Sequence, residues 1–369
     1  GPFYHDAPDQ EKSLYWLAFN NNKRGITLNI ETNEGQLLFK KLAQHADFVI
    51  ESFPPGYMDR HGLNYSMLSE INPRIIVTSI TPFGQSGPYK DYKVADIVAW
   101  GMAGPMYVCG DPDRPPLQIG FPQAYINAGV SAAVGSLVAH YWRGSTGEGQ
   151  QVDVSIQESA VWSQLAAHHY WSYQGEIQRR VGTFRIGRDT KGVAQRITWP
   201  CKDGFVALSM LGGPAGAKSN RAMVEWIESE GMANEFLKNL DWNSVDGART
   251  TQELQNCIEE VFGRFILAHT KAELLEGAVM RGVWLYPVYT VKGLVESQQL
   301  AARGHWVEIE HQELGADIKY PGAFVVASET PCTIRHRAPL IGEHNDEIYE
   351  GELGLTNKEV IALKQSGVI

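Results

Sequence analysis

The segment FPQAYINAGVSAAVGSLVAHYW, residues 121–142, joins a short turn to a long apolar stretch of helical character. The start of such a helix often holds a catalytic side chain or a bound anion, because the first backbone N–H groups have no helical partner. The turn offers Tyr125 but no carboxylate. A phenol with a pKa near ~10 is mostly neutral at pH 7, so Tyr125 is a weak nucleophile.

Two cations stand in loops that follow strand-like segments. Arg60 lies in SFPPGYMDRHG, residues 52–62, and Lys93 lies just before the segment ADI. Near one edge of a sheet, two cations and exposed backbone N–H groups can hold phosphates. The alternative, in which Arg60 only pairs with a carboxylate, explains the same residues equally well.

Other chemistry-bearing patterns are weak. The chain has neither a GxGxxG fingerprint nor a P-loop, and GGPAGAK (residues 212–218) lacks the spacing of a phosphate loop, which predicts a surface turn. His168 and His169 are adjacent on a predicted helix and are expected to point to different sides. His336 and His344 lie in a predicted loop without a nucleophile pattern, so we expect structural roles and no metal site.

Composition limits the classes of partner. The 369 residues include 32 Lys and Arg against 42 Asp and Glu, a net charge of −10, which disfavours nucleic acid or an anionic membrane as a partner. The four cysteines are far apart, as in proteins of a reducing cytoplasm. No run reaches the ~18 apolar residues of a membrane span, and the first residues do not have the order of a signal peptide. These features predict a soluble, cytoplasmic protein.

Hydrophobic periodicity indicates the elements that position these residues. We expect strands at 25–30, 47–53 and 74–81, with helices at 33–46 and 66–73 between them. Strands that alternate with helices predict a parallel α/β sheet. A small-residue helix is then expected at 127–142.

The rest of the chain suggests an inserted domain. We expect residues 1–199 to form the first part of a large domain that ends in a basic crossover segment, residues 200–290 a small domain, and residues 291–369 a return to the large domain with a C-terminal arm. Within this plan, the small domain begins with residues 201–211, a helix falls at 219–232 and a strand-like segment at 282–290.

The ordered blocks of this sequence resemble one known family. Residues 47–104, together with NNNKRGITLNI, GSTGEGQQVDVSIQES and RAPLIGEHNDEIYEGELGL, resemble the class III (CaiB/BaiF) CoA-transferases. The resemblance runs from about Ser13 to the C-terminus. It implies a Rossmann-like large domain that binds CoA, a small inserted α+β domain, and two interlocked subunits. Family members also carry a longer N-terminal part, with residues of the CoA and acyl site.

The resemblance also implies a binding site for coenzyme A or acyl-CoA. In the family a Phe and an Arg of the turn that follows a strand bind CoA, and Phe53 and Arg60 match them. Ser52 stands where many members have Asn, and Lys93 matches a basic residue that lines the nucleotide site in some members. The glycine-rich loop that covers the site in some transferases has no counterpart here, since RDTKGVAQRITW, residues 188–199, occupies that region.

The family nucleophile is an Asp immediately before the small-residue helix, and an alignment without gaps places Tyr125 there. A carboxylate can form an acid anhydride and then an enzyme–CoA thioester, whereas a phenol cannot act as that carrier. Asp153 and Glu158 align after the helix, where structural or capping roles suit them. Related racemases use a His and an Asp, and Ala95 and Tyr125 fall at those positions.

We therefore expect a CoA-transferase subunit without a catalytic residue of its own. Within the family, the likeness is greatest to the E-type subunits of the succinyl-CoA:(R)-benzylsuccinate enzymes, in which only one of two homologous subunits keeps the Asp. This implies a heterodimer or heterotetramer with an Asp-bearing partner, succinyl-CoA and benzylsuccinate as substrates, and Tyr125 filling the unused site. An active homodimer with another carboxylate and a non-enzymatic acyl-CoA-binding protein are the alternatives; a racemase or hydrolase is disfavoured.

Overall fold

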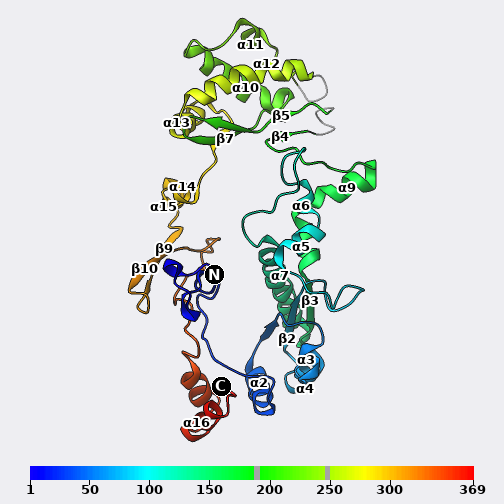
Figure 1. Cartoon of the computed structure of the whole chain (residues 1–369), viewed down its shortest axis with the longest axis vertical. Helices are drawn as coiled ribbons and strands as arrows, with labels where there is room; N and C mark the ends of the chain where they lie inside the picture. Colours follow the sequence, from blue (N-terminus) through cyan, green and yellow to red (C-terminus); the bar gives the residue numbers. More distant parts are fainter. Residues whose placement is uncertain (187–191, 246–249) are drawn as a thin grey trace. The chain divides into compact units, whose positions relative to one another are not determined.

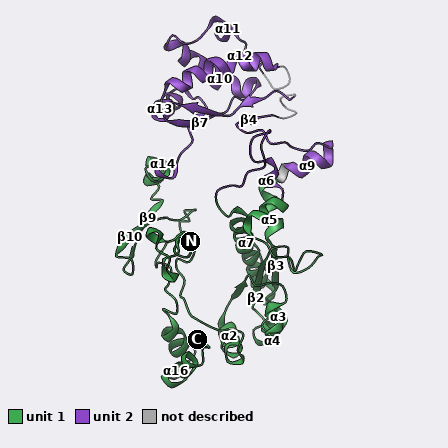
Figure 2. Cartoon of the chain, in the orientation of Figure 1, with its two compact units in different colours: residues 1–103, 121–164, 294–369 green, residues 104–120, 165–293 purple. Residues whose placement is uncertain are grey.

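The chain forms two compact units in the computed structural model (Figures 1 and 2). The structure describes residues 1–186, 192–245 and 250–369. Unit 1 consists of residues 1–103, 121–164 and 294–369, and unit 2 consists of residues 104–120 and 165–293. Both chain ends therefore belong to unit 1. The expected domain limits at residues 199 and 290 remain predictions.

A parallel sheet forms the centre of unit 1. Its strand order is β1 (Phe48–Glu51), β2 (Ile76–Thr81) and β3 (Gln151–Ser155), and both strand pairs are parallel. Helices α2 (Asn33–His45) and α4 (Tyr65–Ile71) precede β1 and β2 in the chain. The predicted α/β class with a parallel sheet is confirmed.

The long helix α7 (Gln123–Thr146) packs on β2 and β3 (Figure 1). Its buried residues are mostly small. Ala128 and Ala132 are buried on this face, and the hydroxyls of Ser136 and Thr78 lie 2.7 Å apart. A Cβ at Gly135 would lie 3.0 Å from Val152 Cγ1, so a larger residue there would displace the Val152 side chain. The helix is longer than the predicted 127–142, because its first turn already includes Tyr125.

The segment at residues 25–30 is not a strand, contrary to the prediction. The N–H of Gly25 donates to His344 Nδ1 at 3.1 Å, and the N–H of Thr27 donates to Asn345 Oδ1 at 3.0 Å. Side chains of the C-terminal arm thus accept hydrogen bonds from the N–H groups of Gly25 and Thr27. In a strand these N–H groups would donate to the backbone of a neighbouring strand instead. His344 has the structural role that was expected of it.

The C-terminal part of unit 1 is a hairpin followed by helical turns. Strands β9 (Trp306–His311) and β10 (Ala316–Pro321) pair antiparallel. Buried residues of the end of the chain, including Tyr349 and Val360, form one cluster with Leu38 of α2. The further helices of unit 1 are α1 (Leu14–Phe19), α3 (Tyr57–Arg60), α5 (Asp96–Met102), α8 (Ile156–Val161), α14, which begins in unit 2 (Val291–Val295), α15 (Gln298–Ala302), α16 (Asn357–Gln365) and the π-helical η5 (Glu347–Glu352).

Unit 2 has its own core around an antiparallel sheet with the order β6-β7-β8. The predicted surface turn at 212–218 is wrong, because α10 begins at Gly213 and buries Gly216, whose added Cβ would meet Leu211 O. Part of the segment 188–199 lies outside the described residues. The elements are α6 (Pro105–Val108), α9 (Leu165–Gln174), β4 (Phe184–Arg185), β5 (Gln195–Arg196), β6 (Thr198–Cys201), β7 (Gly204–Leu208), α10 (Gly213–Ser229), α11 (Glu235–Asn239), α12 (Gln252–Ala268), α13 (Lys271–Arg281) and β8 (Leu285–Pro287).

Among the helices of the described residues, none is both long enough and apolar enough to cross a membrane.

Candidate functional site

The first turn of α7 holds Tyr125 against the start of α5. The N–H of Tyr125 donates to Asp96 Oδ1 at 2.9 Å, and its hydroxyl donates to the carbonyl oxygen of Val94 at 3.4 Å. Asp96 is the first residue of α5, where a negative charge is favoured by the free N–H groups of the helix start. The Asp96 carboxylate thus stabilises the N-terminal ends of both α5 and α7.

The environment of Tyr125 keeps its phenol protonated. Burial raises the pKa of Tyr125, and the negative charge of Asp96 raises it further. At neutral pH the side chain is therefore a neutral hydrogen-bond donor, and it donates to a backbone carbonyl. The site offers no phenolate for nucleophilic attack.

A second group of side chains lies directly after β1. Gly56, with φ at +78°, turns the chain into α3, and the rings of Phe53 and Tyr57 stack with centroids 4.5 Å apart. The Arg60 guanidinium lies 5.6 Å from the centroid of the Tyr57 ring. An aromatic surface next to a guanidinium suits a planar, anionic ligand. Ser52 precedes this group and is exposed.

Arg60 and Lys93 are both exposed and free of carboxylate partners. Neither forms an ion pair within the part of the chain that the structure describes, so the alternative in which Arg60 pairs with a carboxylate is not observed. The structure therefore groups Ser52, Phe53 and Arg60 in one turn after β1. Lys93 lies in another segment, which leads into α5, and it precedes Val94, whose carbonyl accepts from Tyr125.

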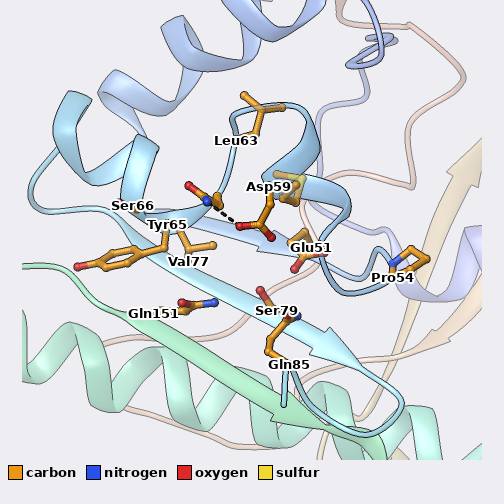
Figure 3. Close-up of a pocket in the computed structure, with 13 residues that line it drawn as sticks. Glu51, Pro54, Asp59, Leu63, Tyr65, Ser66, Val77, Ser79, Gln85 and Gln151 are labelled. Atoms are coloured by element: carbon orange, nitrogen blue, oxygen red, sulfur yellow. Dashed lines mark hydrogen bonds between the residues drawn. The ribbon is translucent and has the colours of Figure 1, made fainter. Parts of the chain in front are cut away.

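A polar cavity of about 170 Å³, which the sequence analysis missed, lies between the sheet and the α3–α4 segment (Figure 3). Glu51, Ser79 and Gln151 come from the three strands, and Asp59 comes from α3. Ser79 is 4% exposed. The signal in the sequence was Glu51, the one polar residue of the otherwise apolar strand β1. No cation is among the residues that line this cavity, so it does not fit a phosphate.

A larger cavity, of about 390 Å³, lies at the loop that follows β2. Its lining includes Phe83, Tyr89, Asp153 and Glu158. Both carboxylate oxygens of Asp153 accept from the N–H of Gln85, at 3.2 and 3.0 Å. Asp153 thus fixes the loop, which is the structural role expected of it.

The remaining candidates carry no catalytic geometry. The rings of His168 and His169 lie 4.1 Å apart, so the prediction that they point to different sides is wrong. Among the described residues, no group of three or more His, Cys, Asp or Glu side chains has the geometry of a metal site. Ala95 precedes α5 and supplies no acid or base. The N–H of His336 donates to Asn22 Oδ1.

Comparison with known proteins places these features in a family. The sequence profile of CoA-transferase family III matches residues 2–345. The chain belongs to this family. It is 34% identical to succinyl-CoA:(R)-benzylsuccinate CoA-transferase subunit BbsE of Thauera aromatica, over 100% of the chain and 88% of the relative. It is 31% identical to a formyl-CoA:oxalate CoA-transferase of Streptomyces avermitilis, over 99% of the chain and 88% of that protein.

Solved structures agree with this assignment. The crystal structure of a CaiB/BaiF family protein from Brucella suis superposes with a TM-score of 0.78 at 26% identity, and the match covers 92% of this chain and 84% of that one. Relatives in the family include enzymes named for succinyl-CoA with D-citramalate and for succinate with glutarate. The family therefore supports CoA-transferase chemistry on CoA thioesters, and Tyr125 lies within the matched residues.

Proposed function

We propose that this chain is the non-catalytic subunit of a heteromeric class III CoA-transferase, whose homologous partner supplies the nucleophilic Asp. The observation that carries the proposal is Tyr125 in the first turn of α7, where its neutral phenol donates to the carbonyl of Val94. The similarity to a relative named as a subunit supports a heteromer. We propose that the two subunits interlock.

The reaction explains why a phenol cannot replace the carboxylate. An enzyme carboxylate attacks the thioester carbonyl, expels the CoA thiolate and forms a mixed anhydride. The thiolate then attacks the enzyme-side carbonyl, which releases the first acid and leaves an enzyme–CoA thioester. The carboxylate of the acceptor acid then attacks the enzyme–CoA thioester, expels the CoA thiolate and forms a second mixed anhydride. The thiolate attacks the acyl carbonyl of the acceptor, which gives the new acyl-CoA and frees the enzyme carboxylate. Attack by a phenol gives an aryl ester instead, in which the enzyme side has no carbonyl for the thiolate to attack.

Ser52, Phe53, Arg60 and Lys93 are the proposed contacts for coenzyme A or an acyl-CoA. The stacked aromatic rings beside Arg60 support a place for the planar base, and the unpaired cations support contacts to phosphates. Arg60 and Lys93 lie in different segments of unit 1, and the several phosphate groups of CoA offer each of them a separate contact.

Succinyl-CoA as donor and a benzylsuccinate-type acid as acceptor are the proposed substrates, on the basis of the BbsE relative. The proposal requires no metal and includes neither nucleic acid nor membrane as a partner. We place the complex in the cytoplasm, because all four cysteines are free thiols, as expected in a reducing compartment.

Native mass spectrometry of the protein purified from its own cells, with peptide identification of the chains that co-purify, tests this proposal. We expect a homologous chain in equal stoichiometry that carries Asp at the position of Tyr125. A complex that contains only copies of this chain and transfers CoA would contradict the proposal. A stable homodimer that binds CoA without turnover would instead support an acyl-CoA-binding protein.

One observation favours a second candidate function, an active transferase without a partner. Asp96 is a carboxylate whose Oδ1 lies 2.9 Å from the N–H of Tyr125, next to the position of the family nucleophile. In this case Asp96 would carry the enzyme–CoA thioester. Peptide mass spectrometry of the isolated chain after incubation with succinyl-CoA distinguishes the two candidates, since only the second places CoA on the peptide that contains Asp96.

A further inference from the structure

The polar cavity between the sheet and the α3–α4 segment has no part in the proposed function (Figure 3). Its lining includes the carboxylates of Glu51 and Asp59, and no Lys, Arg or His is among the described residues that line it. Arg60 of the same turn lies outside this lining, with its guanidinium 5.6 Å from the centroid of the Tyr57 ring. The charged side chains of the cavity wall are therefore all negative, so the cavity attracts a cation.

The side chain of Ser79 lies beside Glu51 in the wall of this cavity. Ser79 pairs in register with Glu51 of β1 and with Asp153 of β3, and side chains paired in this way stand on the same face of a sheet. Both carboxylate oxygens of Asp153 accept from the N–H of Gln85, so Asp153 is engaged in the loop. Glu51 instead faces the cavity.

Ser79 provides an independent sign of a ligand. It is 4% exposed, and its hydroxyl has no hydrogen-bond partner among the described residues. A buried hydroxyl is normally hydrogen-bonded, and one that lines a polar cavity obtains its partner from the contents of that cavity. Water alone would supply a partner but would leave the charges of Glu51 and Asp59 unbalanced. A cation both coordinates the hydroxyl oxygen and balances these charges.

Each of the two carboxylates has one oxygen left for such an ion. The N–H of Phe53 donates to Glu51 Oε2 at 2.7 Å, and the side-chain amide of Asn64 donates to Asp59 Oδ1 at 2.6 Å. Glu51 Oε1 and Asp59 Oδ2 have no hydrogen-bond partner in the part of the chain that the structure describes. Carboxylate and hydroxyl oxygens are the ligands that Mg²⁺ and Ca²⁺ prefer. The donor set therefore suits a hard divalent cation.

The cavity has room for an ion that keeps part of its water. Its volume is about 170 Å³, and a water molecule takes about 30 Å³ in the liquid. Two carboxylates are fewer than the groups of three that are absent among the described residues, so water must complete the coordination. An ion held by one or two carboxylates and several waters is the usual arrangement for Mg²⁺.

We propose that the cavity binds a hard divalent cation, Mg²⁺ or Ca²⁺, through Glu51, Asp59 and Ser79, with water as the remaining ligands. Glu51 ends β1 and Asp59 lies in α3, so the ion joins the two ends of the turn that carries Phe53. It stabilises this turn and takes no part in CoA transfer. The inference does not depend on the proposed function, since no step of that reaction uses the ion.

Luminescence of Tb³⁺, an ion with the ligand preference of Ca²⁺, measures binding to the full chain. Light absorbed by the Tyr65 ring, which lines the cavity, excites a Tb³⁺ ion bound there. We expect MgCl₂ or CaCl₂ to displace the bound Tb³⁺, and KCl at equal ionic strength to leave it in place. Displacement by methylammonium chloride but by neither divalent salt overturns the inference, because the cavity then holds an organic cation.

Asp59→Asn removes one charge from the site and keeps an oxygen that can accept from Asn64. We expect the Tb³⁺ dissociation constant to rise on the order of 10- to 100-fold, because the affinity of such sites depends on the number of charged ligands. Glu70→Gln is the matched control, since Glu70 is an exposed carboxylate of α4 outside the cavity lining, and it should leave the constant unchanged. An unchanged constant in Asp59→Asn, or an equal rise in Glu70→Gln, overturns the inference.

Thermal unfolding separates loss of the site from damage to the fold. In MgCl₂ or CaCl₂ at ten times the dissociation constant, we expect the wild-type midpoint to rise by roughly 1–3 °C above its value in KCl, and the midpoint of Asp59→Asn to stay unchanged. A wild-type midpoint that is equal in all three salts overturns the inference. If Asp59→Asn is already destabilised in KCl, Ser79→Ala decides, because it removes a single hydroxyl. A Tb³⁺ dissociation constant that rises about 2- to 10-fold in Ser79→Ala supports the site, and an unchanged one overturns it.

Discussion

Tyr125 is the residue on which the proposed non-catalytic role of this chain rests. Its hydroxyl donates to the Val94 carbonyl, its N–H is held by Asp96, and its pKa is raised by burial and by the Asp96 charge. The residue is therefore held in place as a neutral side chain. Whether the surrounding site still supports acyl transfer is a separate question that a substitution answers.

Tyr125→Asp restores a carboxylate at the start of α7. We expect the isolated variant to form an enzyme–CoA thioester with succinyl-CoA, at a level on the order of 100-fold above wild type, because the carboxylate supplies the missing carrier. Hydroxylamine trapping followed by peptide mass spectrometry measures the adduct and its position. Tyr125→Asn, which has nearly the same shape as the aspartate but no nucleophilic oxygen, is the control and should form none.

Arg60→Gln tests the proposed CoA contact. A charge-assisted hydrogen bond contributes about 1.5–3 kcal/mol, so we expect affinity for CoA to fall about 10- to 100-fold. Isothermal titration calorimetry measures the dissociation constant. Arg74→Gln removes an exposed Arg of the same unit, whose guanidinium donates to the backbone oxygen of Gly147, and should not change the affinity. Equal losses in both variants would rule out a specific role for Arg60.

At the scale of elements, the C-terminal arm holds the segment at residues 25–30 in place. The Tyr349 hydroxyl donates to the Thr27 carbonyl at 2.6 Å, and Asn345 contacts both the N–H and the hydroxyl of Thr27. Tyr349 is fully buried, and burial raises its pKa to about 12. The chain ends are thus joined by side-chain hydrogen bonds and a small apolar cluster.

The raised pKa of Tyr349 predicts a loss of stability at high pH. The unfolded chain loses the phenol proton near pH ~10, whereas the folded chain keeps it until about 12. The contribution is complete below pH 10 and is lost as the pH rises to 12, by about 3 kcal/mol in the free energy of unfolding. Urea unfolding across this range measures it. The free energy of unfolding should fall less steeply with pH in Tyr349→Phe than in wild type. It should fall as in wild type in Tyr141→Phe, because the Tyr141 ring is exposed.

At the scale of the whole molecule, exposed apolar surface links stability to assembly. If exposed apolar side chains of α7, such as Val134 and Val138, are covered in the proposed complex, mass action stabilises the folded chain as its concentration rises. We expect the midpoint of thermal unfolding to rise by roughly 1–4 °C for each tenfold increase in concentration. Differential scanning calorimetry measures the midpoint. A midpoint that does not change with the concentration of the wild-type chain would contradict this expectation.

Much of the fold was predictable from local patterns. The strands at β1 and β2 and the helices α2 and α4 follow from the alternation of apolar and polar residues, and the buried small residues of α7 follow from their spacing. The start of α10 was missed because Gly and Pro usually indicate a turn, while Pro also fits the first turn of a helix. The polar cavity was missed because Ser79 and Gln151 are 72 positions apart and meet only across paired strands.

The sequence by itself determined the parallel sheet, the family and the absence of a carboxylate at position 125, because these depend on residue types and short-range order. Only the tertiary structure decided that residues 25–30 pair with the C-terminal arm, that Asp96 holds the N–H of Tyr125, and that Arg60 has no carboxylate partner among the described residues. The first two findings are contacts between positions far apart in the chain, and the third is the lack of such a contact. Local periodicity carries no information about which distant hydrogen-bonding groups satisfy each other, and this is decided only when the elements pack.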